Sequence, residues 1–122
     1  SGPATALQPA AAKAGKPPSK PAPALTMQTL EQARALLDEA KALNNDGVRL
    51  RDAGKNQQAR DVQSAAKDKI DALKRLLEQP LAWQEEAEFE NWAQPAEYVT
   101  LGALYGEVSR VEKRVRMGGG TR

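Results

Sequence analysis

GVRLRDAGKNQQARDVQSAA, residues 47–66, contains the turn around which the rest of the chain is organised. Gly54 separates two helical patterns, and a glycine there can adopt the left-handed conformation that closes a helix. Before it, small and apolar residues recur at helical spacing on one stripe: Leu36, Ala40, Leu43, Gly47 and Leu50. After it, a second helix begins near Asn56 and carries its own stripe: Ala59, Val62, Ala66, Ile70, Leu73 and Leu77. Two helices joined by so short a turn pack antiparallel, so the sequence predicts a helical hairpin over residues 29–78.

The two ends of this hairpin carry helix-boundary signals. Thr29 and Gln32 form a capping-box pattern, in which each side chain can satisfy a free backbone N–H at a helix start. Gln79 and Pro80 follow the second stripe, and a proline inside a helix removes a hydrogen bond. We therefore expect order to begin at Thr29 and the second helix to end before Pro80.

Residues 81–117 are expected to form helices that cover the hairpin, because a single helical pair cannot bury its own apolar faces. A short helix is predicted from about Leu81 to Trp92, and a last one from Pro95 to about Met117. The last helix has one apolar face: Tyr98, Leu101, Tyr105, Val108, Val111 and Val115. Residues 118–122 start with three glycines and are expected to form a flexible tail. No segment alternates with a period of two, so the predicted fold is all-α, a small antiparallel three- or four-helix bundle over residues 26–117.

Residues 1–25, SGPATALQPAAAKAGKPPSKPAPAL, differ in composition from everything that follows. Six prolines disfavour a continuous helix or a paired strand, and the few bulky apolar residues cannot offset the entropy of ordering. The sequence therefore predicts a disordered Pro/Ala/Lys-rich linker without the apolar run of a signal peptide. Because the first residue is not methionine, we expect the chain to be part of a larger protein.

The composition excludes several classes of chemistry. Of 122 residues none is cysteine or histidine, which excludes disulfides, thiolate or imidazole metal sites, a cysteine nucleophile and a Ser-His-Asp triad. The glutamates at 85, 86, 88 and 90 are typical of a solvated helix face, because carboxylate metal centres in bundles normally add histidine. No apolar run approaches the roughly 18 residues needed to cross a membrane. We therefore expect no enzymatic activity, no metal site, no cofactor and no membrane span.

Charge and aromatic residues are concentrated in one part of the chain. Residues 76–109 contain seven glutamates and no lysine or arginine, and all five aromatic residues fall between positions 83 and 105. Core packing explains some of these rings, but a bundle this small is expected to leave Trp92 partly exposed. An aromatic surface surrounded by carboxylates suits a basic or amphipathic partner segment. The predicted partner-binding residues are Trp83, Glu86, Glu88, Phe89, Glu90 and Trp92.

The end of the last helix, RVEKRVR, gives the alternative site. Its bases can complement the helix dipole without any ligand, or they can contact an acidic partner or the phosphates of nucleic acid. No aromatic residue is interleaved with them, as RNA or single-stranded binding would favour. The alternative contact residues are Arg110, Lys113, Arg114 and Arg116.

The hairpin resembles one tetratricopeptide repeat. The matching positions are Gly47, Leu50, Gly54, Ala59 and Ala66, within Ala40 to Asp71. The chain departs from that family at Asp46, Gln63 and Asp71, where a large apolar residue, an aromatic and a proline are usual. It is also similar to the hairpin of microtubule-interacting-and-trafficking domains, which are three-helix bundles. Both resemblances imply a helical module that binds peptides or proteins, and neither specifies a ligand.

These observations predict a non-catalytic helical protein–protein interaction module, an adaptor or scaffold within a larger protein. It would bind a basic or amphipathic segment through the acidic and aromatic surface. The alternative is a nucleic-acid-associated accessory domain that uses the basic linker and the basic helix end. The compartment stays open, with the cytoplasm favoured over secretion, and the oligomeric state stays open too.

Overall fold

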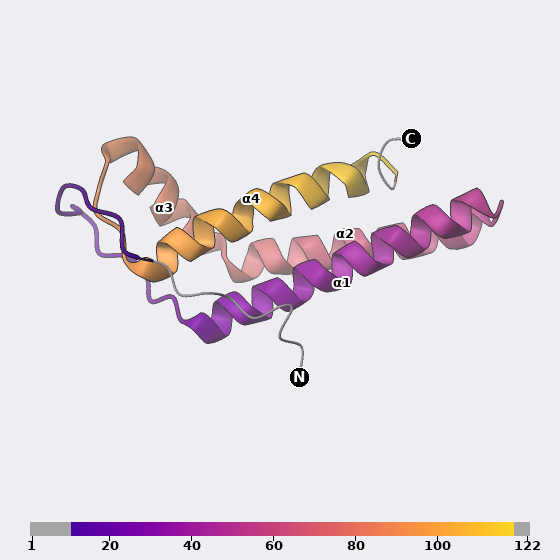
Figure 1. Ribbon diagram of the computed structural model, residues 1–122, viewed down its shortest axis with the longest axis horizontal. Helices are drawn as coiled ribbons and strands as arrows, with labels where there is room; N and C mark the ends of the chain where they lie inside the picture. Colours follow the sequence, from indigo (N-terminus) through magenta and orange to yellow (C-terminus); the bar gives the residue numbers. More distant parts are fainter. Residues whose placement is uncertain (1–10, 119–122) are drawn as a thin grey trace.

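A computed structural model describes residues 11–118, and within this range the chain forms four α-helices and no β-strand (Figure 1). The helices are α1 (Met27–Asp52), α2 (Asn56–Leu76), α3 (Glu78–Glu90) and α4 (Ala96–Arg116). The prediction of an all-α bundle is confirmed. Of the predicted tail, only Gly118 lies within the described residues; it has a φ of 74°, and its carbonyl accepts a hydrogen bond from Arg51 Nη1 at 2.6 Å.

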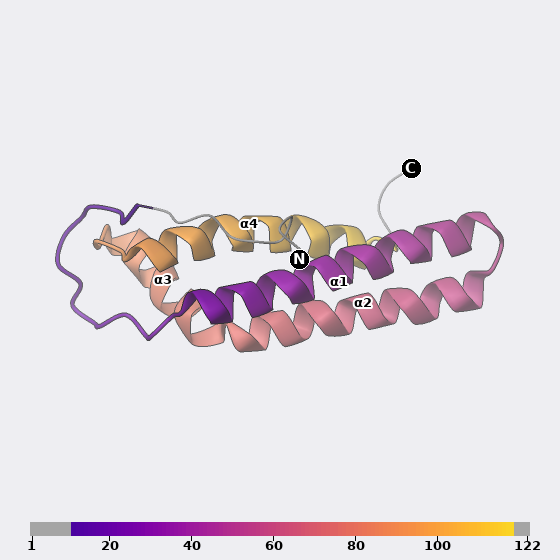
Figure 2. The same ribbon diagram turned by 60° about the horizontal axis from the view of Figure 1, so that its bottom comes forward.

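The helices α1 and α2 lie side by side and antiparallel (Figure 2). Gly54 has a φ of 79° in the turn between them, as its place in the sequence predicts. The α2 stripe is buried except for Val62, which is half-buried. Gly47 faces Gln63, since a Cβ on Gly47 would lie 2.7 Å from Gln63 Cγ, so the close approach at Gly47 is to that side chain.

The buried face of α1 differs from the predicted stripe. Leu36, Leu43 and Leu50 are only partly buried. The fully buried positions of the helix are Leu30, Ala33, Leu37, Ala40, Asn44 and Gly47. These positions form one stripe at helical spacing, which shares Ala40 and Gly47 with the predicted stripe but buries Leu37 and Asn44 in place of Leu36 and Leu43. The helix α1 packs against both α2 and α4.

The helix α4 is antiparallel to α2 and packs on both helices of the hairpin (Figure 1). Its predicted apolar face is buried apart from Tyr105, and the buried set also includes Leu104. Two ion pairs reinforce this packing: Arg34 on α1 binds Glu107 through two hydrogen bonds of 2.9 and 2.7 Å, and Lys74 on α2 binds Glu112 at 3.0 Å. The hydrogen bonds from Arg34 hold the pKa of Glu107 below its ordinary value.

Two helix boundaries lie earlier than predicted. Thr26 caps α1, and its Oγ1 accepts a hydrogen bond from the backbone N of Thr29 at 3.1 Å, so the first turn can bury Leu30. Leu77 alone separates α2 from α3, and Pro80 is the third residue of α3. A proline is tolerated there because the first backbone N–H groups of a helix have no partner within it.

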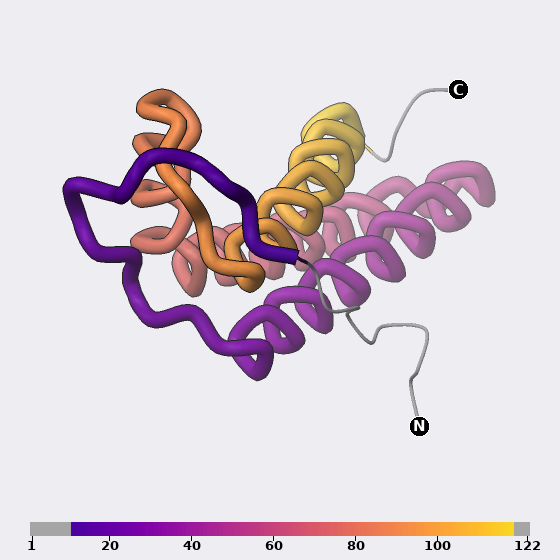
Figure 3. Tube along the Cα trace, turned by 60° about the vertical axis from the view of Figure 1, so that its left-hand side comes forward, coloured from indigo at the N-terminus to yellow at the C-terminus, as the bar shows by residue number. Residues whose placement is uncertain are grey.

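Residues 11–25 do not behave as the predicted disordered linker. They contain no helix or strand, and they pass around the end of the bundle where α3 and the start of α4 lie (Figure 3). Leu25 is buried in the core, and Ala22 packs against it. We call residues 11–25 the docked segment; residues 1–10, the rest of the predicted linker, lie outside the described residues. None of the described helices is both long enough and apolar enough to cross a membrane.

Candidate protein-interaction surfaces

Three aromatic side chains form a buried cluster where α3 meets α4. The ring centroid of Trp83 lies 5.9 Å from that of Trp92 and 4.7 Å from that of Tyr98, the latter in an edge-on arrangement. Exposure is 5% for Trp83, 4% for Trp92 and 1% for Tyr98. The expectation that Trp92 stays partly exposed is therefore wrong, because the docked segment adds cover that the helices alone were not expected to give.

The docked segment pairs with the backbone that joins α3 to α4. Lys13 and Gln94 exchange two hydrogen bonds of 2.9 Å, and Lys16 donates to Asn91 at 3.0 Å and accepts from Ala93 at 2.8 Å. Between these lysines, a Cβ on Gly15 would lie only 2.7 Å from backbone atoms of residues 91–93. This contact therefore requires glycine at position 15.

Side chains of α3 and α4 hold the rest of the docked segment. Trp83 Nε1 donates to the carbonyl of Lys20 at 2.8 Å, and the Tyr98 hydroxyl donates to the carbonyl of Pro23 at 2.7 Å. Lys20 also pairs with Glu86 at 3.0 Å. The bundle therefore binds main-chain carbonyls with aromatic donors and lysine with carboxylates.

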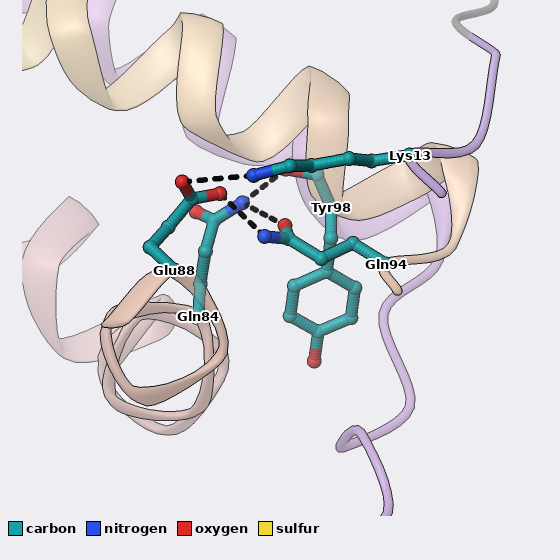
Figure 4. Close-up of polar contacts among 5 residues, drawn as sticks. All are labelled: Lys13, Gln84, Glu88, Gln94 and Tyr98. Carbon is teal, nitrogen blue, oxygen red and sulfur yellow. Dashed lines mark hydrogen bonds and ion pairs between the residues drawn. The ribbon is translucent and has the colours of Figure 1, made fainter. Parts of the chain in front are cut away.

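A chain of polar contacts connects the docked segment to the interior (Figure 4). Lys13 Nζ donates to Glu88 Oε1 at 3.1 Å, Gln94 Nε2 donates to Glu88, and Gln84 Nε2 donates to Gln94 Oε1 at 2.8 Å. Gln84 also donates to the carbonyl of Tyr98. The hydrogen bonds from Gln94 and then Lys13 lower the pKa of the Glu88 carboxyl.

The structure divides the six predicted partner-binding residues into two groups. Trp83, Trp92, Glu86 and Glu88 contact the docked segment, so the tryptophans are not an open surface. Phe89 and Glu90 are exposed, and Phe89 at 86% is the most exposed large apolar side chain of the described residues.

A groove of about 880 Å³ lies between the end of α2, the length of α3 and the middle of α4. Leu81 and Tyr105 supply its apolar surface, and the small residues Ala82 and Gly102 leave room on its α3 and α4 sides. The other lining residues are polar or charged: Lys74, Arg75, Glu78, Gln84, Glu85 and Glu88. Composition alone did not indicate this groove, since its lining comes from three helices.

Phe89 belongs to the α3 face that lines the groove. Glu78, Ala82, Glu85 and Phe89 are spaced by four, three and four residues, so they share one side of the helix. Within residues 11–118, neither Glu78 nor Glu85 forms a salt bridge. An exposed ring and two carboxylates without a salt-bridge partner among the described residues therefore lie along one edge of the groove.

The basic end of α4 is a separate surface. Arg110, Lys113, Arg114 and Arg116 are all exposed. Arg116 pairs with Glu112 at 2.9 Å, whereas the side chains of Lys113 and Arg114 have no salt-bridge partner in the described part of the chain. Among residues 11–118, no three acidic residues lie close enough together to hold a metal ion.

Comparisons with known proteins give no assignment: no protein-family description, curated protein or solved structure matches this chain.

Proposed function

We propose that this chain is a non-catalytic protein-interaction module that binds an amphipathic, lysine- or arginine-bearing helix of a partner in the groove between α2, α3 and α4. The observation that carries the proposal is the alignment of exposed Phe89 with the groove-lining face of α3. A large aromatic side chain in water next to an apolar groove is typical of an interaction surface.

The shape and chemistry of the groove favour a helix as its occupant. Its two long walls are helices, and Ala82 and Gly102 allow a third helix to approach closely. Leu81, Tyr105 and Phe89 offer apolar contacts to the apolar face of that helix. Grooves of this kind recognise anchor residues of the bound helix that are spaced by three, four and seven positions.

The charges on the rims specify the partner further. Glu78 and Glu85 are two turns apart, about 10 Å along α3, so partner bases seven residues apart would face both carboxylates. Arg75 at the α2 end of the groove is exposed and suits an acidic residue of the partner. The opposite charges of Arg75 and of the two glutamates would set the orientation of the bound helix.

Selection from a random peptide display library against the whole chain tests this proposal. We expect the enriched peptides to be amphipathic and to carry Lys or Arg at helical spacing. Glu85→Lys should weaken their binding about tenfold through repulsion. Glu90→Lys makes the same charge change at an exposed α3 position outside the groove lining, and it should change the affinity less than twofold. Equal effects of the two variants would contradict binding in the groove.

The second candidate function is nucleic-acid binding by the basic end of α4. It is favoured by the exposed side chains of Lys113 and Arg114, which have no salt-bridge partner within residues 11–118. A salt series with duplex DNA and with RNA tests it, because release of counterions makes affinity fall steeply with salt. Lys113→Glu with Arg114→Glu should reduce both the affinity and that slope. Weak nucleic-acid binding that the two substitutions leave unaltered would exclude this function for the basic end of α4.

A further inference from the structure

We propose that the surface formed by Trp83, Tyr98 and residues 91–94 is a binding site for lysine- and proline-rich peptide segments. The chain's own docked segment occupies this site, and a partner segment of the same chemistry displaces it. This site adjoins the groove and shares Glu88 with it, but the inference does not depend on how the groove is used.

The contacts of the docked segment are those that proteins use to recognise extended peptides. Backbone pairing of Lys13 and Lys16 with residues 91–94 supplies sequence-independent affinity, as in strand addition. Trp83 and Tyr98 donate to the carbonyls of Lys20 and Pro23, much as aromatic grooves bind proline-rich segments. The surface therefore binds both the main chain and the side chains of the docked segment.

Three features of the segment supply specificity. Lysines at positions 13 and 20 meet Glu88 and Glu86. Glycine is required at position 15, where a Cβ would lie 2.7 Å from the opposing backbone. Proline at 17, 18, 21 and 23 restricts the free segment, which lowers the entropy lost on docking. A competing partner segment should therefore contain the pattern Lys-x-Gly followed by prolines and a second lysine.

The exposure of the ion pairs indicates that docking is reversible. Side-chain exposure is 39% and 54% for Lys13 and Glu88, and 65% and 42% for Lys20 and Glu86. Ion pairs this open to water contribute little each. The segment therefore relies on its backbone pairing, on the donors Trp83 and Tyr98, and on its covalent attachment, which gives it a high effective concentration.

The test is binding of a labelled peptide, AAKAGKPPSKPAPAL (residues 11–25), to the whole chain by fluorescence anisotropy. In the wild-type chain the attached segment competes, whereas Gly15→Ala in the chain weakens that competitor. We expect the Gly15→Ala chain to bind the peptide at least about tenfold more tightly than the wild type. A peptide that itself carries Gly15→Ala should bind neither chain, and the neighbouring Ala14→Ser chain should behave as the wild type.

Equal binding of the peptide by the wild-type and Gly15→Ala chains, or binding by neither, would overturn the proposal. Should the Gly15→Ala chain not fold, hydrogen exchange in the wild-type chain decides instead. A saturating amount of the peptide should then speed exchange at the amides of Lys13 and Lys16, and unchanged exchange would overturn the proposal. Glu85→Lys should not affect this peptide, so the result is independent of the groove.

Discussion

Gln94 carries no recognisable signal in the sequence, yet its side chain joins Glu88 to buried Gln84 at the edge of the docked segment. The glutamates and aromatic residues of this region stand out by composition alone. Gly15 contacts backbone atoms of residues 91–93, and the backbone of Gln94 pairs with Lys13. These contacts join distant parts of the sequence, and no local pattern encodes them. At this scale the sequence predicts where the charged and aromatic residues concentrate, but not which of them face water.

The stability that Tyr98 contributes should depend on pH. Burial raises its pKa from 10.0 to about 12, so the folded chain keeps this proton where the unfolded chain releases it. The stability that Tyr98 contributes is complete below pH 10 and is lost as the pH rises toward 12. We expect the free energy of unfolding to fall by about 2 kcal/mol across this interval. Denaturant titrations in steps of pH measure it.

Tyr98→Phe is the matched control for this pH dependence. It keeps the ring against Trp83 and removes the hydroxyl that binds Pro23. It should cost about 1 kcal/mol at neutral pH and abolish most of the decline in stability above pH 10. A decline of the same size in Tyr98→Phe would assign the effect to another group.

The helical hairpin illustrates what the sequence predicts about elements. The turn at Gly54 and the apolar stripe of α2 follow from local spacing and are found as predicted. The buried stripe of α1 differs from the predicted one, because polar Asn44 lies on it while apolar Leu43 is only half-buried. Helix boundaries were less predictable, since Thr26 and Thr29 can both cap and Pro80 is compatible with either side of the junction.

A pair of substitutions at the start of α2 tests the packing of the hairpin. Ala59 is 3% exposed, so Ala59→Glu buries an unpaired charge and should cost about 3 kcal/mol. Gln58 is exposed in the first turn, where a carboxylate is favourable, so Gln58→Glu should cost less than about 0.5 kcal/mol. Denaturant midpoints compare the two variants, and similar midpoints would show that α2 is rotated from this arrangement.

The docked segment is part of the folded molecule and not a separate linker. The segment's own apolar content is too low to order it, but the acidic, aromatic surface of α3 and α4 supplies the contacts that do. Lys13 and Lys20 from one end of the chain meet Glu88 and Glu86 of α3, so complementary charges far apart in sequence are brought together. Charge segregation of this kind is visible in the sequence, but whether the two regions meet within one chain depends on the fold.

Acid should loosen this association. The pKa of Glu88 lies below its ordinary value of 4.5, so docking is supported above that value and weakens as the pH falls through the lowered pKa. Loss of the docked segment would uncover Trp83 and Trp92, and we expect their emission to shift to longer wavelength in this range. Glu88→Gln should remove most of the dependence on pH. Identical acid titrations of the wild type and Glu88→Gln would contradict the role of this carboxylate.

Hydrogen exchange of the unmodified chain, resolved by residue, tests most directly whether residues 11–25 belong to the folded unit. The amides of Lys13, Lys16, Ala93 and Gln94 each donate to a backbone carbonyl across the contact. They should exchange at least about tenfold more slowly than the same amides in a free peptide, because exchange then requires local opening. The exposed amides of Ala12 and Ala14 serve as internal references. If Lys13 and Lys16 exchange as fast as these references, the segment is not docked and both tryptophans must be buried in another way.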